Sequence, residues 1–243
     1  MHLIEYNSYS DIKIQFDDNW AAIVHTTYGH FKNGTVKNPY HPNKYGGIVG
    51  DKRNSSSNGA MCKEYIAWYN ILIRCYDVKH KIKSPRYIGC KVCDEWKYYW
   101  NFYDWICAQE NYDAWRKEDN WAIDKDIKFK HNKIYSPNNC LLVSKRINNL
   151  FLKANSIRGK YPLGVCLKTL RNGRQVFEAQ CNNPFLHKQV TIGIYDTPLM
   201  AFLAYKKYKE EIIKMTAKEE FQKGNISTEC YKYMMNYEVE IDD

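Results

Sequence analysis

The sequence predicts an α+β protein in which small sheets and helices follow one another along the chain. Apolar and polar residues alternate in short runs, which is the pattern of half-buried strands. These runs cover residues 12–16, 163–167, 175–181 and 189–194. Stretches 63–75 and 96–108, and a third that begins at Pro198, instead space apolar residues as an amphipathic helix does.

The composition is that of an ordinary folded protein with a basic surplus. Of 243 residues, 36 are basic and 27 acidic, 44% are hydrophobic and 15% are aromatic. These values exclude a disordered tail, a collagen-like fibre and a membrane bundle. Basic charge with many aromatic residues suits a nucleic-acid surface, but it also suits a packed core under a coat of solvated lysines.

The first residues lack the basic-then-apolar order of a signal peptide, so we expect a cytoplasmic protein with reduced cysteines. No window approaches the roughly 18 unbroken apolar residues of a membrane span, and we expect no membrane partner. Cys90 and Cys93 have the spacing of half a zinc site. A second pair is missing, so a structural zinc is not expected and buried thiols are predicted.

Two polar breaks, at 51–59 and 155–162, divide the chain into three predicted parts. The first, 1–58, is β-rich, and its Asn33-Gly34 pair predicts a turn between possible strands. The second, 59–158, holds most of the surplus charge. Its aromatic stripe at 96–108 is predicted to be core rather than a platform for stacking bases. The third part is 159–243.

The central part contains a strand–loop–strand–helix pattern. Residues 122–127 predict a short strand that carries Asp124 and Asp126, and Ser136-Pro137 predicts a turn. Residues 141–143 predict the return strand, after which Ser144 can cap a helix. A carboxylate from the first strand and an amide from the helix could then converge on one hard divalent cation, a geometry suited to phosphodiester cleavage.

This pattern resembles the HNH (ββα-metal, His-Me finger) nucleases, in particular homing-type endonucleases of phages and mobile introns. Ile123-Asp124-Lys125 looks like the family's first element and Asn139-Cys140-Leu141 like its second, with Asn148 nine residues after Asn139. The resemblance implies a central ββα-metal nuclease unit with Asp124 and Asn148 as ligands of one magnesium or manganese ion. Asn139 would orient the catalytic group or brace the loop.

Lys125 stands where the family has its general-base histidine. A protonated lysine is no base unless its pKa falls by several units, and the flanking Asp124 and Asp126 favour the charged form. Three readings follow. Lys125 contacts the phosphate while Asp126 or His131 is the base, the cation alone activates the water, or the nuclease is impaired. The surrounding basic side chains would contact the DNA backbone: Lys128, Lys130, Lys133, Lys145 and Arg146.

The last part reads as a three-stranded antiparallel sheet followed by one helix. Asn172-Gly173 predicts a hairpin turn, and Thr197-Pro198 predicts a helix start. Residues 160–221 resemble the APETALA-two-type DNA-binding domain, through Leu163-Gly164-Val165 and the Ala201-to-Tyr205 segment. The resemblance implies a sheet placed in the DNA major groove. Candidate contacts on the strands and turns are Lys168, Arg171, Arg174, Gln180, Lys188 and Gln189.

The sequence therefore predicts a site-directed, metal-dependent DNA endonuclease of homing type, expected to act on double-stranded DNA as a monomer without a small-molecule cofactor. The alternative is a catalytically impaired HNH-like protein that binds specific DNA sequences. A third reading, an RNA-binding or interaction protein, rests on charge and aromatic content alone.

Overall fold

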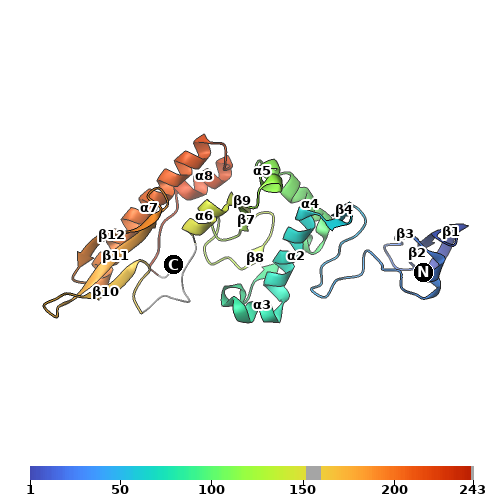
Figure 1. The fold of residues 1–243 in the computed structure, drawn as a ribbon, viewed down its shortest axis with the longest axis horizontal. Helices are drawn as coiled ribbons and strands as arrows, with labels where there is room; N and C mark the ends of the chain where they lie inside the picture. The colour runs from blue at the N-terminus through green and yellow to red at the C-terminus, as the bar shows by residue number, and fades with distance from the viewer. Residues whose placement is uncertain (152–159, 242–243) are drawn as a thin grey trace. The chain divides into compact units, whose positions relative to one another are not determined.

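The computed structural model describes residues 1–151 and 160–241 and confirms the α+β class (Figure 1). The chain forms two compact units. The first unit comprises residues 1–109 and 133–139, and the second comprises 110–132 and 140–243. No helix in the described part of the chain combines the length and apolar character needed to cross a bilayer.

The first unit begins with the predicted β-rich part. Strands β1 (His2–Ser8), β2 (Asp11–Gln15) and β3 (Ile23–Thr26) form an antiparallel sheet with β2 in the middle. Ile12 and Ile14 on β2 are fully buried, as their alternation with polar residues predicts.

The turn predicted at Asn33-Gly34 does not join two strands. Helix α1 (Tyr28–Lys32) precedes it, and Gly34 takes a positive φ of 66° while its N–H bonds to the Phe31 carbonyl. The prediction of a hairpin here is wrong, because the same left-handed glycine that suits a hairpin turn also terminates a helix.

Aromatic side chains form the main core of the first unit. Helices α2 (Lys63–Tyr76) and α4 (Tyr99–Cys107) pack together, and the buried Trp68 indole donates to the Trp96 carbonyl at 2.7 Å. The predicted helix over 96–108 begins only at Tyr99, after a separate 3₁₀ turn at Glu95–Lys97. The interpretation of its aromatic stripe as core is confirmed, since Tyr99, Trp100 and Phe102 are buried.

Smaller elements complete the first unit. Helix α3 (Val78–Lys83) is followed by a 3₁₀ turn at Pro85–Tyr87. The polar break at 51–59 contains half of a tight hairpin, formed by β4 (Ser56–Ser57) and β5 (Ala60–Met61). Strand β6 (Lys91–Val92) pairs in parallel with β8 (Ile134–Tyr135), a pairing between distant segments that local patterns did not predict.

The second unit contains the predicted strand–loop–strand–helix segment, preceded by α5 (Tyr112–Lys117). Strand β7 (Trp121–Asp124) pairs antiparallel with β9 (Leu141–Ser144), and α6 (Lys145–Leu150) follows directly. The order of elements is confirmed. The prediction that the first strand reaches Ile127 is wrong, because the chain turns immediately after Asp124.

The rest of the second unit is a sheet with two helices. Strands β10 (Val165–Thr169), β11 (Gln175–Asn183) and β12 (Lys188–Tyr195) form the predicted antiparallel sheet. Helix α7 (Pro198–Gln222) starts at the predicted Thr197 cap, and an unpredicted helix α8 (Thr228–Met235) follows. One core joins the sheet, α6, α7 and α8 through buried side chains such as Val143, Ile147, Ala179, Phe202 and Ile213.

Most of the predicted break at 155–162, and the predicted boundary between 158 and 159, lie outside the described residues. The three-part division of the chain stays a prediction.

Candidate functional site

The nominated ligands Asp124 and Asn148 belong to one strand–strand–helix unit. Trp121 pairs with Ser144 and Asp124 pairs with Leu141, so Asp124 lies at the last paired position of β7. The Ser144 hydroxyl accepts the Ile147 N–H and starts α6, as predicted. Asn148 then follows on α6 as a half-buried side chain, next to the buried Ile147.

Asp124 closes a tight turn with one of its two carboxylate oxygens. Oδ1 accepts the backbone N–H groups of Asp126 and Ile127, both at 2.8 Å. These bonds explain why the strand ends here, since an aspartate that bonds its own downstream backbone favours a turn. Burial, reinforced by the neighbouring Asp126 charge, raises the pKa of Asp124 to about 6.

The buried Lys125 side chain makes several hydrogen bonds within the 125–132 loop, which follows β7. Its side chain is 8% exposed, and Nζ donates to both Asp126 carboxylate oxygens at 2.7 and 2.8 Å. Nζ also donates to the Asn132 carbonyl at 2.7 Å, and the Asn132 amide returns a bond to the Lys125 carbonyl at 2.9 Å. An ammonium has three donors, and these bonds use them on two groups of the same loop. Lys125 therefore holds the loop together through Asp126 and the Asn132 carbonyl.

The other nominated polar residues are placed differently. Asn139 belongs to the first unit, where its N–H bonds to the Ser136 hydroxyl and its amide donates to the Ile134 carbonyl at 3.3 Å. These contacts brace the predicted Ser136-Pro137 turn. His131, nominated as an alternative base, is exposed and has a positive φ of 57° in the 125–132 loop.

The predicted ligand set consists of one carboxylate and one amide, both oxygen donors of the kind that a hard cation prefers. Within the described residues Oδ1 is the only oxygen of Asp124 in a hydrogen bond, so Oδ2 remains available, and Asn148 offers an amide oxygen. No group of three or more His, Cys, Asp or Glu side chains in the described ranges could hold a metal. With so few protein ligands, a bound magnesium ion would have to keep several waters, as magnesium usually does.

Most nominated basic residues near this unit already have acidic partners. Lys128 is almost buried and pairs with Glu229 of α8 at 2.8 Å. Lys130 pairs with Glu240 at 2.9 Å and lies over the Tyr237 ring. Arg146 joins α6 to α7 through ion pairs with two glutamates, Glu219 and Glu220. Lys133 belongs to the first unit, and Lys145 is exposed.

On the face of the C-terminal sheet that points away from α7, a predicted DNA-contacting lysine is likewise paired with an acidic residue. Cys181 and Ala179 of β11 enter the core beneath α7, so Glu178 and Gln180 point to the opposite face. Glu178 accepts from Lys168 Nζ at 2.6 Å and from Gln180 Nε2 at 2.5 Å. The Lys168 contact is the main reason that the pKa of Glu178 is lowered.

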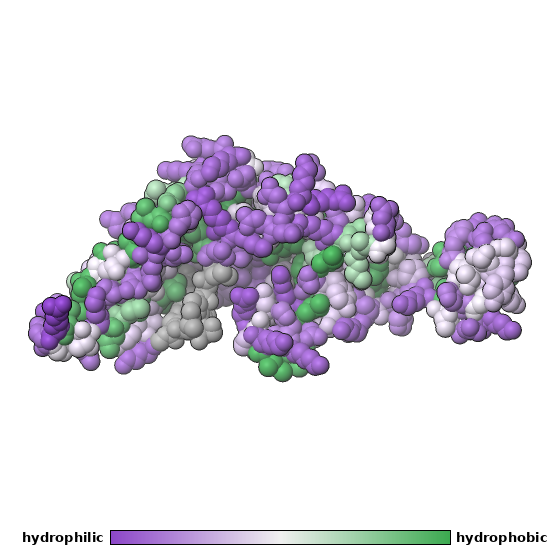
Figure 2. Space-filling model, in the orientation of Figure 1, coloured by the Kyte–Doolittle hydropathy of each residue, from purple (hydrophilic) through white to green (hydrophobic). Residues whose placement is uncertain are grey.

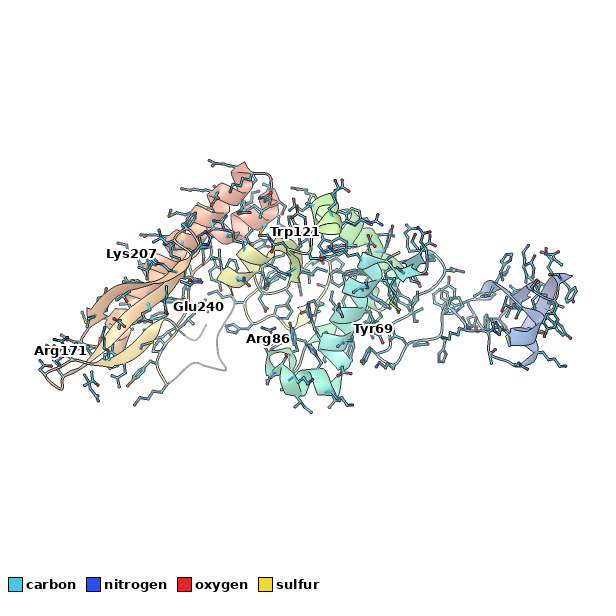
Figure 3. All side chains as sticks on the ribbon, in the orientation of Figure 1. Tyr69, Arg86, Trp121, Arg171, Lys207 and Glu240 are labelled. Atoms are coloured by element: carbon cyan, nitrogen blue, oxygen red, sulfur yellow. The ribbon has the colours of Figure 1, made fainter. Side chains whose placement is uncertain are left out.

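The remaining nominated residues of the sheet lie at its ends. Arg174 pairs with Asp196 at 2.5 Å. Arg171 is exposed in the β10–β11 turn, at the tip of that hairpin (Figure 3). Lys188 and Gln189 are exposed at the start of β12.

The sequence reasoning missed the acidic C-terminal segment that supplies several of these partners. Lys206 Nζ donates to the Val239 carbonyl, and Glu210 accepts the Val239 N–H, both at 2.8 Å. The last six residues of the chain contain four acids, a charge bias that could have suggested a basic partner within the same protein.

Comparison of the chain with known protein families, with curated proteins and with solved structures finds no match.

Proposed function

We propose that the chain is a metal-dependent endonuclease of homing type that hydrolyses phosphodiester bonds in double-stranded DNA. The observation that carries the proposal is Asp124, a half-buried carboxylate with one oxygen available, in a strand–strand–helix unit whose helix bears Asn148. One magnesium or manganese ion held by these two side chains would neutralise charge on the reacting phosphate.

The roles of this chain's own residues follow from their contacts. Asp124 shapes the loop through Oδ1, which leaves Oδ2 to face a cation. Lys125 is not the base, because its ammonium is committed to Asp126 and the Asn132 carbonyl. The assignment of the base to Asp126, to His131 or to the cation alone stays open. The C-terminal sheet would hold the duplex on its face away from α7.

A second candidate is a duplex-binding protein without nuclease activity. The ion pair of Lys125 favours it, since a residue fixed as a structural cation occupies the position of the family's base. Under this alternative the 125–132 loop is a rigid element of the DNA-binding surface.

Incubation of supercoiled plasmid with the full chain separates the two candidates. The nuclease proposal expects relaxed or linear plasmid with magnesium or manganese and none with excess EDTA. Supercoiled plasmid that stays intact under both conditions, while a labelled duplex is still bound, would favour the second candidate.

The sheet contact makes a prediction about Glu178. Replacing Glu178 with Gln removes a carboxylate that now holds Lys168, so the lysine becomes available to a phosphate. We expect tighter duplex binding and a log–log salt dependence steeper by about 0.9, the value of one added phosphate contact. Fluorescence anisotropy of a labelled duplex at several salt concentrations measures both quantities.

Glu211→Gln is the matched control, because Glu211 is exposed on α7 and its loss changes the net charge equally. Equal effects of the two variants would mean that net charge alone is responsible. No change with Glu178→Gln would mean that Lys168 does not contact the duplex.

A further inference from the structure

The segment from Val78 to Lys91 is rich in basic residues and lacks acidic ones. It contains five lysines and arginines and no aspartate or glutamate: Lys79, Lys81, Lys83, Arg86 and Lys91. It spans α3, the 3₁₀ turn and the start of β6, all within the first unit. None of these residues was among the predicted DNA contacts.

These five cations have no acidic partner among the residues that the structure describes. The ion pairs of the described residues are formed by other basic side chains, including Lys128, Lys130 and Lys168. The nearest acid in sequence, Asp77, caps α3 by accepting the His80 N–H at 2.7 Å and also accepts the Tyr45 hydroxyl. The positive charge of the segment is therefore uncompensated, whereas that of most nominated lysines is not.

The fold adds a sixth cation to this surface from a distant part of the chain. The Lys91 N–H bonds to the Lys133 carbonyl at 2.7 Å, within the parallel pairing of β6 and β8. Lys133 Nζ donates to the Arg86 carbonyl at 3.1 Å. Arg86, Lys91 and Lys133 thus lie together, and we call them, with Lys79, Lys81 and Lys83, the α3 basic surface.

An aromatic contact holds this surface in place. The Tyr87 ring packs against His80 of α3 at 5.4 Å, and the Arg86 guanidinium lies over the same ring at 5.1 Å. The 3₁₀ turn is thereby fixed against the helix, and Arg86 is partly ordered before any ligand arrives. Preordering lowers the entropic cost of binding.

We infer that the α3 basic surface is a second binding surface for the phosphate backbone of double-stranded DNA, separate from the C-terminal sheet. Six cations that have no acidic partner within residues 1–151 and 160–241 suit a polyanion that carries one charge per roughly 1.7 Å of duplex axis. Contacts of this kind position a duplex without reading its sequence. The choice of DNA as the polyanion rests on the proposed function, whereas the presence of a basic surface does not.

Apolar side chains also occur on this surface. Val78 is 70% exposed, Ile82 74% and Ile88 60%, and Figure 2 shows hydrophobic and hydrophilic residues side by side over α3. Basic and apolar side chains together can also bind anionic lipid, so vesicles are one arm of the test.

The test compares two triple variants of the full chain. The surface variant carries Lys79→Gln, Lys83→Gln and Arg86→Gln. The control carries Lys207→Gln, Lys218→Gln and Lys232→Gln, three exposed residues of α7 and α8 with the same loss of charge. Far-ultraviolet circular dichroism and thermal unfolding show that each variant is folded.

Binding of a labelled 30-base-pair duplex is measured by anisotropy at several salt concentrations. We expect the surface variant to bind at least tenfold more weakly and to lose about 2.7 from the log–log salt slope, which is three contacts at about 0.9 each. The control should keep the affinity and slope of the unaltered chain. A folded surface variant with an unaltered slope would overturn the inference.

The vesicle arm uses phosphatidylserine–phosphatidylcholine vesicles and sedimentation. Vesicle binding that is lost in the surface variant, with duplex binding unchanged, would assign the surface to lipid and overturn the inference. Plasmid nicking reports separately on the nuclease proposal, because a chain that nicks nothing can still show the expected change in salt slope.

Discussion

Replacing Asp124 with Asn is expected to reduce metal-dependent plasmid nicking by at least about 100-fold while leaving duplex affinity within about twofold. The substitution removes the negative charge that a divalent cation requires. An asparagine oxygen can still accept the N–H groups of Asp126 and Ile127, so the turn that Asp124 now closes is preserved. Nicking rates under excess manganese and duplex binding without metal measure the two effects separately.

Asp113→Asn is the matched control, because Asp113 is an exposed residue of α5 in the same unit. It should nick like the unaltered chain. Equal nicking by the Asp124 and Asp113 variants would remove Asp124 from the site. Asp124→Ala is less informative, because it also deletes both turn bonds and so mixes loss of fold with loss of chemistry.

Local patterns predicted the elements whose signals lie within a few residues of one another. Alternation located β2 and the three strands of the C-terminal sheet, and the Thr197-Pro198 pair located the start of α7. The same patterns failed where one residue type is typical of two different local structures. Gly34 ends a helix instead of turning a hairpin, and Asp124 ends β7 because its side chain bonds the backbone ahead of it.

The candidate site was predicted as a set of residue types and not as a set of contacts. The order of β7, β9 and α6 and the Ser144 cap follow from local sequence. The partners of the lysines do not. Lys128 meets Glu229 about a hundred residues later, and Lys130 meets Glu240, through packing that no local pattern encodes. A count of basic residues therefore overstates the charge available to a ligand at this site.

Lys125→Met is expected to lower the free energy of unfolding by about 2–3 kcal/mol without removing a base from the reaction. Methionine is close to lysine in length but donates no hydrogen bond, so the Asn132 carbonyl and the Asp126 carboxylate lose their shared partner. Breaking a buried pair costs about 3–5 kcal/mol, and the 42% exposure of Asp126 places this pair below that range. Urea denaturation at neutral pH measures the change.

Lys145→Met makes the same chemical change at an exposed position of α6 and should alter unfolding by no more than about 0.5 kcal/mol. A catalytic role for Lys125 predicts the opposite pattern, with unchanged stability and an altered dependence of nicking on pH.

A structural role also predicts that the effects of changing Lys125 and Asp126 on stability are coupled. In a double-mutant cycle with Asp126→Asn, the double variant should lose less stability than the two single variants together, because both remove one interaction. Additive losses would show that Lys125 and Asp126 stabilise the 125–132 loop independently, and the account of Lys125 as the cation that holds this loop through Asp126 would then be wrong.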